Sequence, residues 1–198
     1  GGLNKLMNIK IITDTACDLP KELLQKYDIE VLPLHISRGD RSYLDMIEIT
    51  PADIFQYVNS GGDICTTAAV NIAEFTACFE RYSLDYDALI VITIGSGFSS
   101  CYQNARIAAE EFPNVFVIDS CNLSSGQGFV VLEASKMAKS RMDVEKLCSY
   151  LERVVPRVEA SFVLDSLDYM KKGGRCSAIL AFGANRLKIK PCITVKVK

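Results

Sequence analysis

The chain has 198 residues, of which 49% are hydrophobic and 23% are charged, and its formal net charge is −2 at pH 7. This composition excludes a disordered chain and suffices for one sizeable core, or for one domain and part of a second. The near balance of charge and the lack of a long basic run argue against nucleic acid or a membrane surface as the main partner.

Short β-branched runs alternate with longer amphipathic segments, a rhythm typical of helices packed on a largely parallel sheet. Strands are predicted at 9–12, 29–37, 89–94, 115–118, 160–164 and 193–197. Helices are predicted at 20–27, 51–59, 72–81, 99–111, 129–139, 144–155, 167–172 and 179–187. We therefore expect an α/β fold, with a boundary near Pro156.

Several local signals set the ends of these elements. Thr50 is a predicted N-cap with Pro51 at the first helical position, and Asp143 or the residue before it is predicted to cap the helix that follows. Loops are predicted at the polar segment 38–43, at Thr66 and Thr67, and at a turn that contains or adjoins Gly126 and Gly128.

A hydroxyl-rich turn, Gly95-Ser96-Gly97-Phe98-Ser99-Ser100, lies where the strand at 89–94 leads into a helix. The first N–H groups of a helix lack intrahelical acceptors, and together with the macrodipole they favour a phosphate or carboxylate. The serines of this segment, which we call the serine turn, are expected to cap the helix or to bind such a ligand.

Two other polar pairs belong to predicted loops: Asp14-Thr15 at the end of the first predicted strand, and Thr66-Thr67 between two predicted helices. Open α/β sheets bind ligands at the carboxyl ends of their strands, where these pairs and the serine turn can converge. Hydroxyl and N–H groups can hold a carboxylate by several hydrogen bonds without a lysine. The alternative is that each hydroxyl only stabilises its own turn or caps its own helix.

The eight cysteines are scattered and show no C-x-x-C spacing, and the chain has one histidine. A zinc site is therefore disfavoured, and reduced thiols of a cytoplasmic protein are the simpler interpretation. Magnesium remains an alternative, since acidic residues follow several strands, although Asp18 is more simply an N-cap. The candidate ligands would be Asp14, Asp18, Asp45 and Asp119.

Two catalytic interpretations compete with ligand binding. The segment Gly97 to Cys101 approaches the nucleophile elbow G-x-S-x-G but lacks its final glycine, and His35 precedes the serine instead of following it. The serine turn also reads G-x-G-x-x-S, and Asp119 ends the next strand, which approaches a dinucleotide fingerprint without its third glycine. A nucleotide-dependent enzyme that uses this turn and Asp119 therefore stays an alternative.

A set of motifs that runs from Ile9 to Pro191 resembles the DegV family of bacterial fatty-acid-binding proteins. The motifs, in chain order, are Ile12 to Pro20, Leu32-Pro33-Leu34, Tyr43-Leu44-Asp45, Thr66-Thr67, Ser96 to Gln103, Val117 to Ser120, Gly173-Gly174-Arg175 and Lys190-Pro191. Within them, Thr15 and Thr67 stand where the family usually has Ser, and Ser100-Cys101 stands where it usually has Gly-Thr.

The resemblance implies a fatty acid buried between two α/β domains. We expect a Rossmann-like parallel-sheet domain over 7–155 and the start of a smaller second domain over 156–198, whose C-terminal part is absent from this chain. Thr67 and Ser96 would bind the carboxylate, with Thr66 and Ser99 close by. The remaining candidates, for contact with the head group or with a kinase, are Arg175, Thr15 and His35.

The resemblance also implies a role without chemistry of its own. The bound acid would be presented to a separate ATP-dependent fatty acid kinase, which forms an acyl phosphate for phospholipid synthesis. No metal or cofactor besides the fatty acid is expected, and the purified chain alone is not expected to turn over a substrate.

Overall fold

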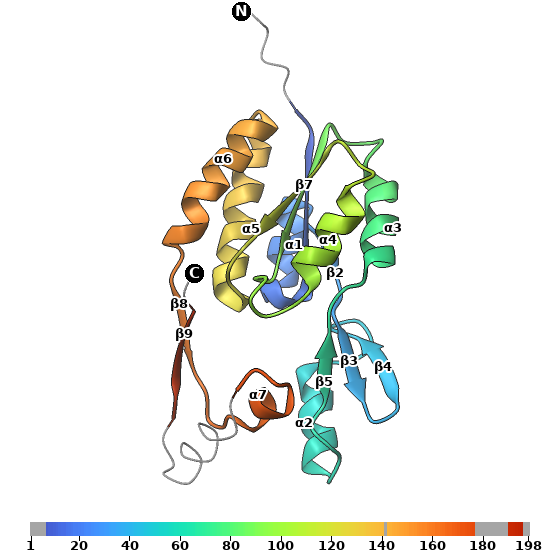
Figure 1. Ribbon diagram of the computed structural model, residues 1–198, viewed down its shortest axis with the longest axis vertical. Coiled ribbons are helices and arrows are strands. Elements are labelled where there is room, and N and C mark those ends of the chain that lie inside the picture. Colours follow the sequence, from blue (N-terminus) through green and yellow to red (C-terminus); the bar gives the residue numbers. More distant parts are fainter. Residues whose placement is uncertain (1–6, 141, 177–189, 196–198) are drawn as a thin grey trace, which may run out of the picture. The chain divides into compact units, whose positions relative to one another are not determined.

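The computed structural model describes residues 7–140, 142–176 and 190–195. Within them the chain forms two compact units, and Figure 1 shows the elements of each. Unit 1 comprises the chain up to Leu32 together with Ala69–Val158. Unit 2 comprises Pro33–Ala68 and the chain from Glu159 onward. The predicted helix at 179–187 lies outside the described residues.

Unit 1 is built on a four-stranded parallel sheet with the strand order β2-β1-β6-β7. The strands are β1 (Ile9–Asp14), β2 (Glu30–Leu32), β6 (Ala88–Thr93) and β7 (Val115–Asp119). Every residue of β1 and β6 is buried, because helices cover both faces of the sheet. This burial explains why β6 appears in the sequence as a nearly continuous apolar run, whereas β1 also buries the polar residues Lys10, Thr13 and Asp14.

Helices pack on both faces of this sheet. They are α1 (Lys21–Tyr27), α3 (Ile72–Tyr82), α4 (Cys101–Ala109), α5 (Ser124–Lys139) and α6 (Val144–Val154), with short 3-10 helices η1 (Thr15–Cys17) and η2 (Val155–Arg157). Figure 1 shows α5 and α6 on one side of the sheet and α3 and α4 on the other. Unit 1 therefore confirms the predicted α/β fold with a parallel sheet.

The main hydrophobic cluster of unit 1 lies between the sheet and helices α5 and α6. Alternate residues of β1 and β6 point to this side, as the two-residue period of a strand requires. The main contributors are Ile9, Ile11, Ala88, Ile90 and Ile92 from the strands and Val130, Val131, Ala134, Leu147 and Leu151 from the helices.

The described part of unit 2 contains two antiparallel sheets and two helices. The first sheet has the order β4-β3-β5, and the second pairs β8 with β9. The elements are β3 (His35–Arg38), β4 (Arg41–Leu44), α2 (Pro51–Asn59), β5 (Thr66–Ala68), β8 (Ala160–Val163), α7 (Asp168–Lys172) and β9 (Cys192–Val195). The rings of Phe55 on α2 and Tyr169 on α7 meet edge to face at a centroid distance of 6.0 Å.

Two of the predicted N-caps are confirmed. The Thr50 hydroxyl accepts a hydrogen bond from the backbone N–H of Asp53, and the Asp53 carboxylate accepts one from the backbone N–H of Thr50, which forms a capping box before Pro51. Of Asp143 and the residue before it, Asp143 is the N-cap of α6, since its carboxylate accepts hydrogen bonds from the first N–H groups of that helix. By contrast, Asp18 does not cap α1: it ends η1 in the left-handed conformation, with φ of 50°.

Three predicted loops are wrong. Arg41–Leu44 is a strand because it forms a hairpin with β3, with only Gly39 and Asp40 between the two strands. Thr66–Ala68 is a strand because it pairs with β3 from about 30 residues away in sequence, a non-local contact that outweighs its polar composition. Helix α5 begins at Ser124, so Gly126 and Gly128 lie inside it. A Cβ atom at Gly128 would lie 2.7 Å from the Cys17 carbonyl oxygen, and the glycine therefore serves the close packing of η1 on the helix.

The unit boundaries also differ from the predicted continuous domain over 7–155. Pro33–Ala68 belongs to unit 2 together with the chain from Glu159. The physical reason is strand pairing: β3, β4 and β5 pair only with one another among the described strands, whereas β2, just before them, pairs with β1. The change of unit at Glu159 lies close to the predicted boundary at Pro156.

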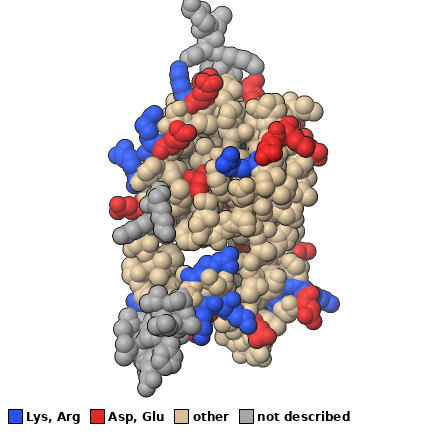
Figure 2. All heavy atoms as spheres, in the orientation of Figure 1, with Lys and Arg blue, Asp and Glu red and all other residues tan. Residues whose placement is uncertain are grey.

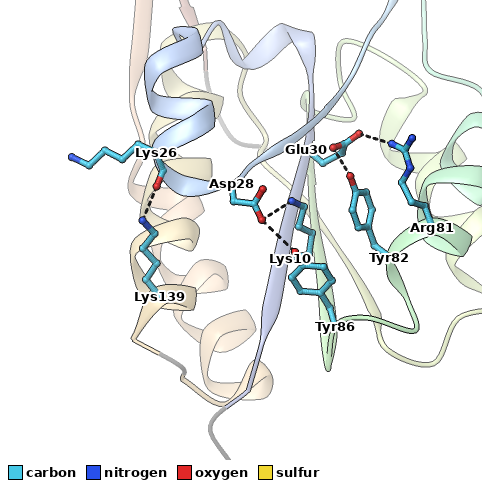
Figure 3. Close-up of polar contacts among 8 residues, drawn as sticks. All are labelled: Lys10, Lys26, Asp28, Glu30, Arg81, Tyr82, Tyr86 and Lys139. Atoms are coloured by element: carbon cyan, nitrogen blue, oxygen red, sulfur yellow. Dashed lines mark hydrogen bonds and ion pairs between the residues drawn. The ribbon is translucent and has the colours of Figure 1, made fainter.

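A polar network fixes the amino end of β1 (Figure 3). The Lys10 ammonium group, whose side chain is 5% exposed, lies 2.8 Å from a carboxylate oxygen of Asp28. The ammonium group also lies 5.0 Å and 5.6 Å from the ring centroids of Tyr82 and Tyr86. The Tyr82 hydroxyl donates to Glu30 at 2.7 Å. Burial of the lysine is thus compensated by one carboxylate and two ring faces.

Candidate functional site

The serine turn lies at the carboxyl end of β6 and leads into α4. Strands β2 and β6 flank β1 on opposite sides, so the chain direction across the sheet reverses between β1 and β6. Open α/β sheets bind their ligands beyond the carboxyl ends of the strands at such a switch point. The serine turn therefore lies at the position where open α/β sheets commonly bind ligands.

The three serines of the turn differ in their hydrogen bonding. Ser96 is exposed, and its hydroxyl makes no hydrogen bond to any described residue. Ser99 is half-buried, and its hydroxyl accepts from the backbone N–H of Cys101 and lies 3.3 Å from the Cys101 sulfur. Ser100 occupies the N-cap position of α4 without a side-chain capping hydrogen bond. Ser99 therefore fulfils the predicted local role, and Ser96 is available to a ligand.

The loop after β7 holds the serine turn. The backbone N–H of Gly95 donates to the carbonyl of Asn122 at 2.7 Å, and that of Ser96 donates to Asp119 at 3.1 Å. The same Asp119 oxygen accepts from the backbone N–H of Cys121 at 2.8 Å. A Cβ atom at Gly95 would lie 2.8 Å from the Asn122 nitrogen, so only glycine permits this close approach of the two loops.

The Asp14 side chain connects the carboxyl end of β1 to that of β6, from which the serine turn begins. Its carboxylate is fully buried and accepts from the backbone N–H of Ile94 at 2.7 Å, from that of Ala16 at 3.1 Å and from the Gln127 amide at 2.9 Å. Burial raises the pKa of Asp14, and these hydrogen bonds oppose the rise. The carboxylate therefore acts as a structural acceptor that joins β1, β6 and α5.

Thr66 and Thr67 belong to β5 in unit 2. In the register of that sheet Thr66 pairs with Ser37 and Thr67 pairs with Ile36. Successive residues of a strand point to opposite faces, so the two hydroxyls lie on different faces of the sheet. Thr66 is half-buried and Thr67 is exposed, which makes Thr67 the better placed of the two to meet a ligand from solvent.

The other predicted contacts fall in different places. Thr15 starts η1, directly after Asp14, in unit 1. His35 is a strand residue of β3, as predicted, and pairs with Leu44 and Ala68. Arg175 follows α7, and its guanidinium donates to the carbonyl of Gly173 at the end of that helix. Figure 2 shows basic side chains gathered over α7, whose last turn carries lysines.

Comparison with known proteins identifies the family. A family model described as an uncharacterised protein of the DegV family matches residues 8–198. The chain belongs to the DegV family. A DegV domain-containing protein of Clostridium acetobutylicum is 35% identical over 190 residues, which are 95% of this chain and 68% of the relative. The resemblance found in the motifs is thereby confirmed.

Solved DegV structures share the fold. A DegV family protein from Thermus thermophilus, described for its fatty acid binding, has a TM-score of 0.88 and 32% identity, covering 96% of this chain and 68% of that chain. A stearic-acid-binding protein from Eubacterium ventriosum has a TM-score of 0.85 and 28% identity, and the match covers 95% of this chain and 67% of that chain. Structural neighbours of this DegV chain therefore bind fatty acids.

The competing interpretations gain no support from the geometry. Asp119 is the residue that a dinucleotide site would use for a ribose, but its Oδ1 already accepts two backbone N–H groups. The hydroxyl of Ser99 contacts Cys101, which is not a general base. Across the described ranges, no group of three His, Cys, Asp or Glu side chains could hold a metal ion, and no helix is long and apolar enough to span a membrane.

The sequence predictions missed the residues that support the serine turn. Asn122 and Gln127 are fully buried polar residues, and Asn104 sits on the first turn of α4. The available signal was a mostly polar segment, Asp119 to Asn122, at the end of a strand. This strand is the one that follows the serine turn and its helix in sequence. Such a segment does not reveal which backbone groups it will meet.

Proposed function

We propose that this chain binds a long-chain fatty acid and holds its carboxylate with hydroxyl groups. The observation that carries the proposal is the likeness to the Thermus thermophilus protein, with a TM-score of 0.88 over 96% of this chain. The stearic-acid-binding neighbour from Eubacterium ventriosum supports the same ligand class. The family of this chain, its fold and the ligands of its structural neighbours thus all support a fatty acid as the ligand.

We assign the carboxylate to Ser96 and Ser99 of unit 1 and to Thr66 and Thr67 of unit 2. Ser96 is the principal donor, because its hydroxyl is exposed and has no partner within the described part of the chain. Thr67 is the exposed member of its pair. Neutral hydroxyl donors bind a carboxylate by charge-assisted hydrogen bonds without the desolvation of a lysine.

Affinity would come chiefly from the acyl chain. Each CH₂ group removed from water contributes about 0.8 kcal/mol before ordering costs. The hydroxyl groups would then fix the orientation of the acid and select a carboxylate over an uncharged lipid. This division of labour suits a binding protein and requires neither a nucleophile nor a general base.

The finer part of the proposal concerns the fate of the ligand. The protein would present the carboxylate to a cytoplasmic fatty acid kinase, which forms the acyl phosphate used in phospholipid synthesis. We assign contacts with the head group or the kinase to Thr15, His35 and Arg175. Arg175 is supported by its exposure and by the basic side chains gathered around α7.

Titration with stearate tests the site. Loss of a hydrogen bond to a charged group costs about 1.5–3 kcal/mol, so Ser96→Ala and Thr67→Ala should each weaken stearate binding about tenfold or more. Ser149→Ala is a matched control, because Ser149 is an exposed serine on α6. Unchanged affinity in both site variants would remove Ser96 and Thr67 from the carboxylate site.

A further inference from the structure

The chain changes from one unit to the other at three described positions, which we call crossings, and each of them is linked by hydrogen bonds or strand pairing to the residues around the serine turn. The chain leaves unit 1 after Leu32, returns at Ala69 and leaves again after Val158. Leu32 pairs with Asp14, whose carboxylate accepts from Ile94 just before the turn. The other two crossings are each held by an asparagine side chain.

Asn122 connects the serine turn to the crossing at Val158. Its carbonyl accepts the Gly95 N–H at 2.7 Å, and its side-chain amide donates to the Val158 carbonyl at 3.1 Å. The residue is fully buried, and the Ser120 hydroxyl also donates to its carbonyl at 3.0 Å. A displacement of the turn therefore acts through a single residue, Asn122, on Val158, after which the chain leaves unit 1.

Asn104 connects the helix after the serine turn to the crossing at Ala69. Its backbone N–H donates to the Ser100 carbonyl at 2.9 Å, which places it on the first turn of α4. Its side-chain amide donates to the Val70 carbonyl at 2.8 Å. Val70 is fully buried and is the second residue of unit 1 after the crossing.

We propose that Asn104 and Asn122 are positioning residues that couple occupancy of the serine turn to the two crossings at Ala69 and Val158. The inference rests on the proposed function, because the fatty acid is the ligand that occupies the turn. Ligand bound at Ser96 stabilises one arrangement of the turn, and the two amide hydrogen bonds stabilise the matching arrangement of the crossings. Because such coupling is reciprocal, loss of the amide hydrogen bonds at the crossings weakens ligand binding.

Asn114 provides a matched control within the same unit. Its side-chain amide also donates to backbone carbonyls, those of Ser83 at 2.9 Å and Tyr86 at 3.2 Å. It precedes β7, so it lies at the amino end of the sheet, away from the serine turn. Asn→Asp at each of the three positions removes the same kind of donor with almost no change in size.

Hydrogen–deuterium exchange with and without stearate tests the coupling. In the wild-type protein, stearate should slow exchange at 95–100, at 69–71 and at 158–160, since ordering of a segment protects its amides. Asn122→Asp should lose the protection at 158–160 and Asn104→Asp that at 69–71, while both keep protection at 95–100. Each should weaken stearate binding about threefold to tenfold, the effect of one hydrogen bond. Asn114→Asp should match the wild type in protection and affinity.

The outcomes separate this inference from the proposed function. If wild-type protein binds stearate and is protected at 95–100 but at neither crossing, the coupling is absent while fatty-acid binding stands. If Asn114→Asp weakens stearate binding as much as Asn122→Asp does, general loss of stability explains the effect and the coupling is again overturned. If the wild type binds no stearate, the proposed function itself fails. If Asn122→Asp does not fold, the coupling is judged from hydrogen exchange of the wild-type protein and from the Asn104→Asp variant, because Asn104 is only half-buried.

Discussion

The carboxylate of Asp14 accepts a hydrogen bond from the backbone N–H of Ile94 at 2.7 Å. This contact joins two neighbouring strands just where one of them enters the serine turn. The same carboxylate accepts from Ala16 and Gln127, so its two oxygens serve three donors from separate elements. The carboxyl end of β1 and β6 is thus organised around one buried carboxyl group, which has no ion-pair partner among the described residues.

Asp14→Asn should therefore destabilise the fold. The amide presents one oxygen where the carboxylate presents two, and its NH₂ group must face a buried donor. We expect a loss of about 1–3 kcal/mol in the free energy of unfolding, measured by urea denaturation. Asp18→Asn is the control, because Asp18 is exposed and asparagine tolerates its left-handed backbone. Equal stability of the two variants would contradict the role of Asp14.

Two glycines of the serine turn should respond differently to alanine. A Cβ atom at Gly95 would lie 2.8 Å and 2.9 Å from backbone atoms of Asn122 and Cys121, whereas one at Gly97 would meet nothing within 4 Å. Gly95→Ala must therefore separate the two loops and should lower the melting temperature by several degrees. Gly97→Ala should leave it almost unchanged. A similar effect of both substitutions would show that the two loops do not pack so closely.

The network in Figure 3 predicts an asymmetry between the partners of one ion pair. Lys10 is buried with 5% of its side chain exposed, whereas the Asp28 side chain is 74% exposed. Asp28→Asn leaves a buried ammonium without its anion and should cost about 3 kcal/mol, but Lys10→Met removes the buried charge and should cost about 1 kcal/mol or less. Chemical denaturation of both variants measures the difference. A larger loss for Lys10→Met would contradict this explanation.

Cys78 should make the fold sensitive to alkaline pH. Burial, and next the carboxylate of Glu30, raise the pKa of its thiol from 9.0 to about 12. Between pH 9 and pH 12 the unfolded chain loses this proton before the folded chain does, so the free energy of unfolding falls as the pH rises. In reducing buffer, Cys78→Ala should show a shallower fall over this range. Parallel curves for the two proteins would exclude a contribution from Cys78.

Local sequence signals predicted the parallel sheet and most helices. The continuous apolar run of β6 and the capping signals at Thr50 and Asp143 are properties of neighbouring residues, and the structure confirms them. Two of the failures have non-local causes. Thr66–Ala68 becomes a strand only through β3, and residue 128 is a glycine because η1 packs closely against helix α5 there.

The same distinction holds for the site. The position of the serine turn, between a strand and a helix, follows from local pattern. The support that it receives from Asp119 and Asn122 comes from the next strand–loop–helix segment, and the hydrogen bond of Asp14 to Ile94 joins residues 80 positions apart in sequence. Such pairings depend on strand order and register, which neither composition nor spacing determines.

Fatty-acid binding is tested most directly by analysis of the purified protein itself. The protein is extracted with organic solvent, and the extract is examined by mass spectrometry, followed by titration of the delipidated protein with stearate. We predict a long-chain fatty acid in equimolar amount, and saturable stearate binding after its removal. A bound nucleotide without lipid, together with no binding of added stearate, would contradict the proposal and support the nucleotide-dependent alternative.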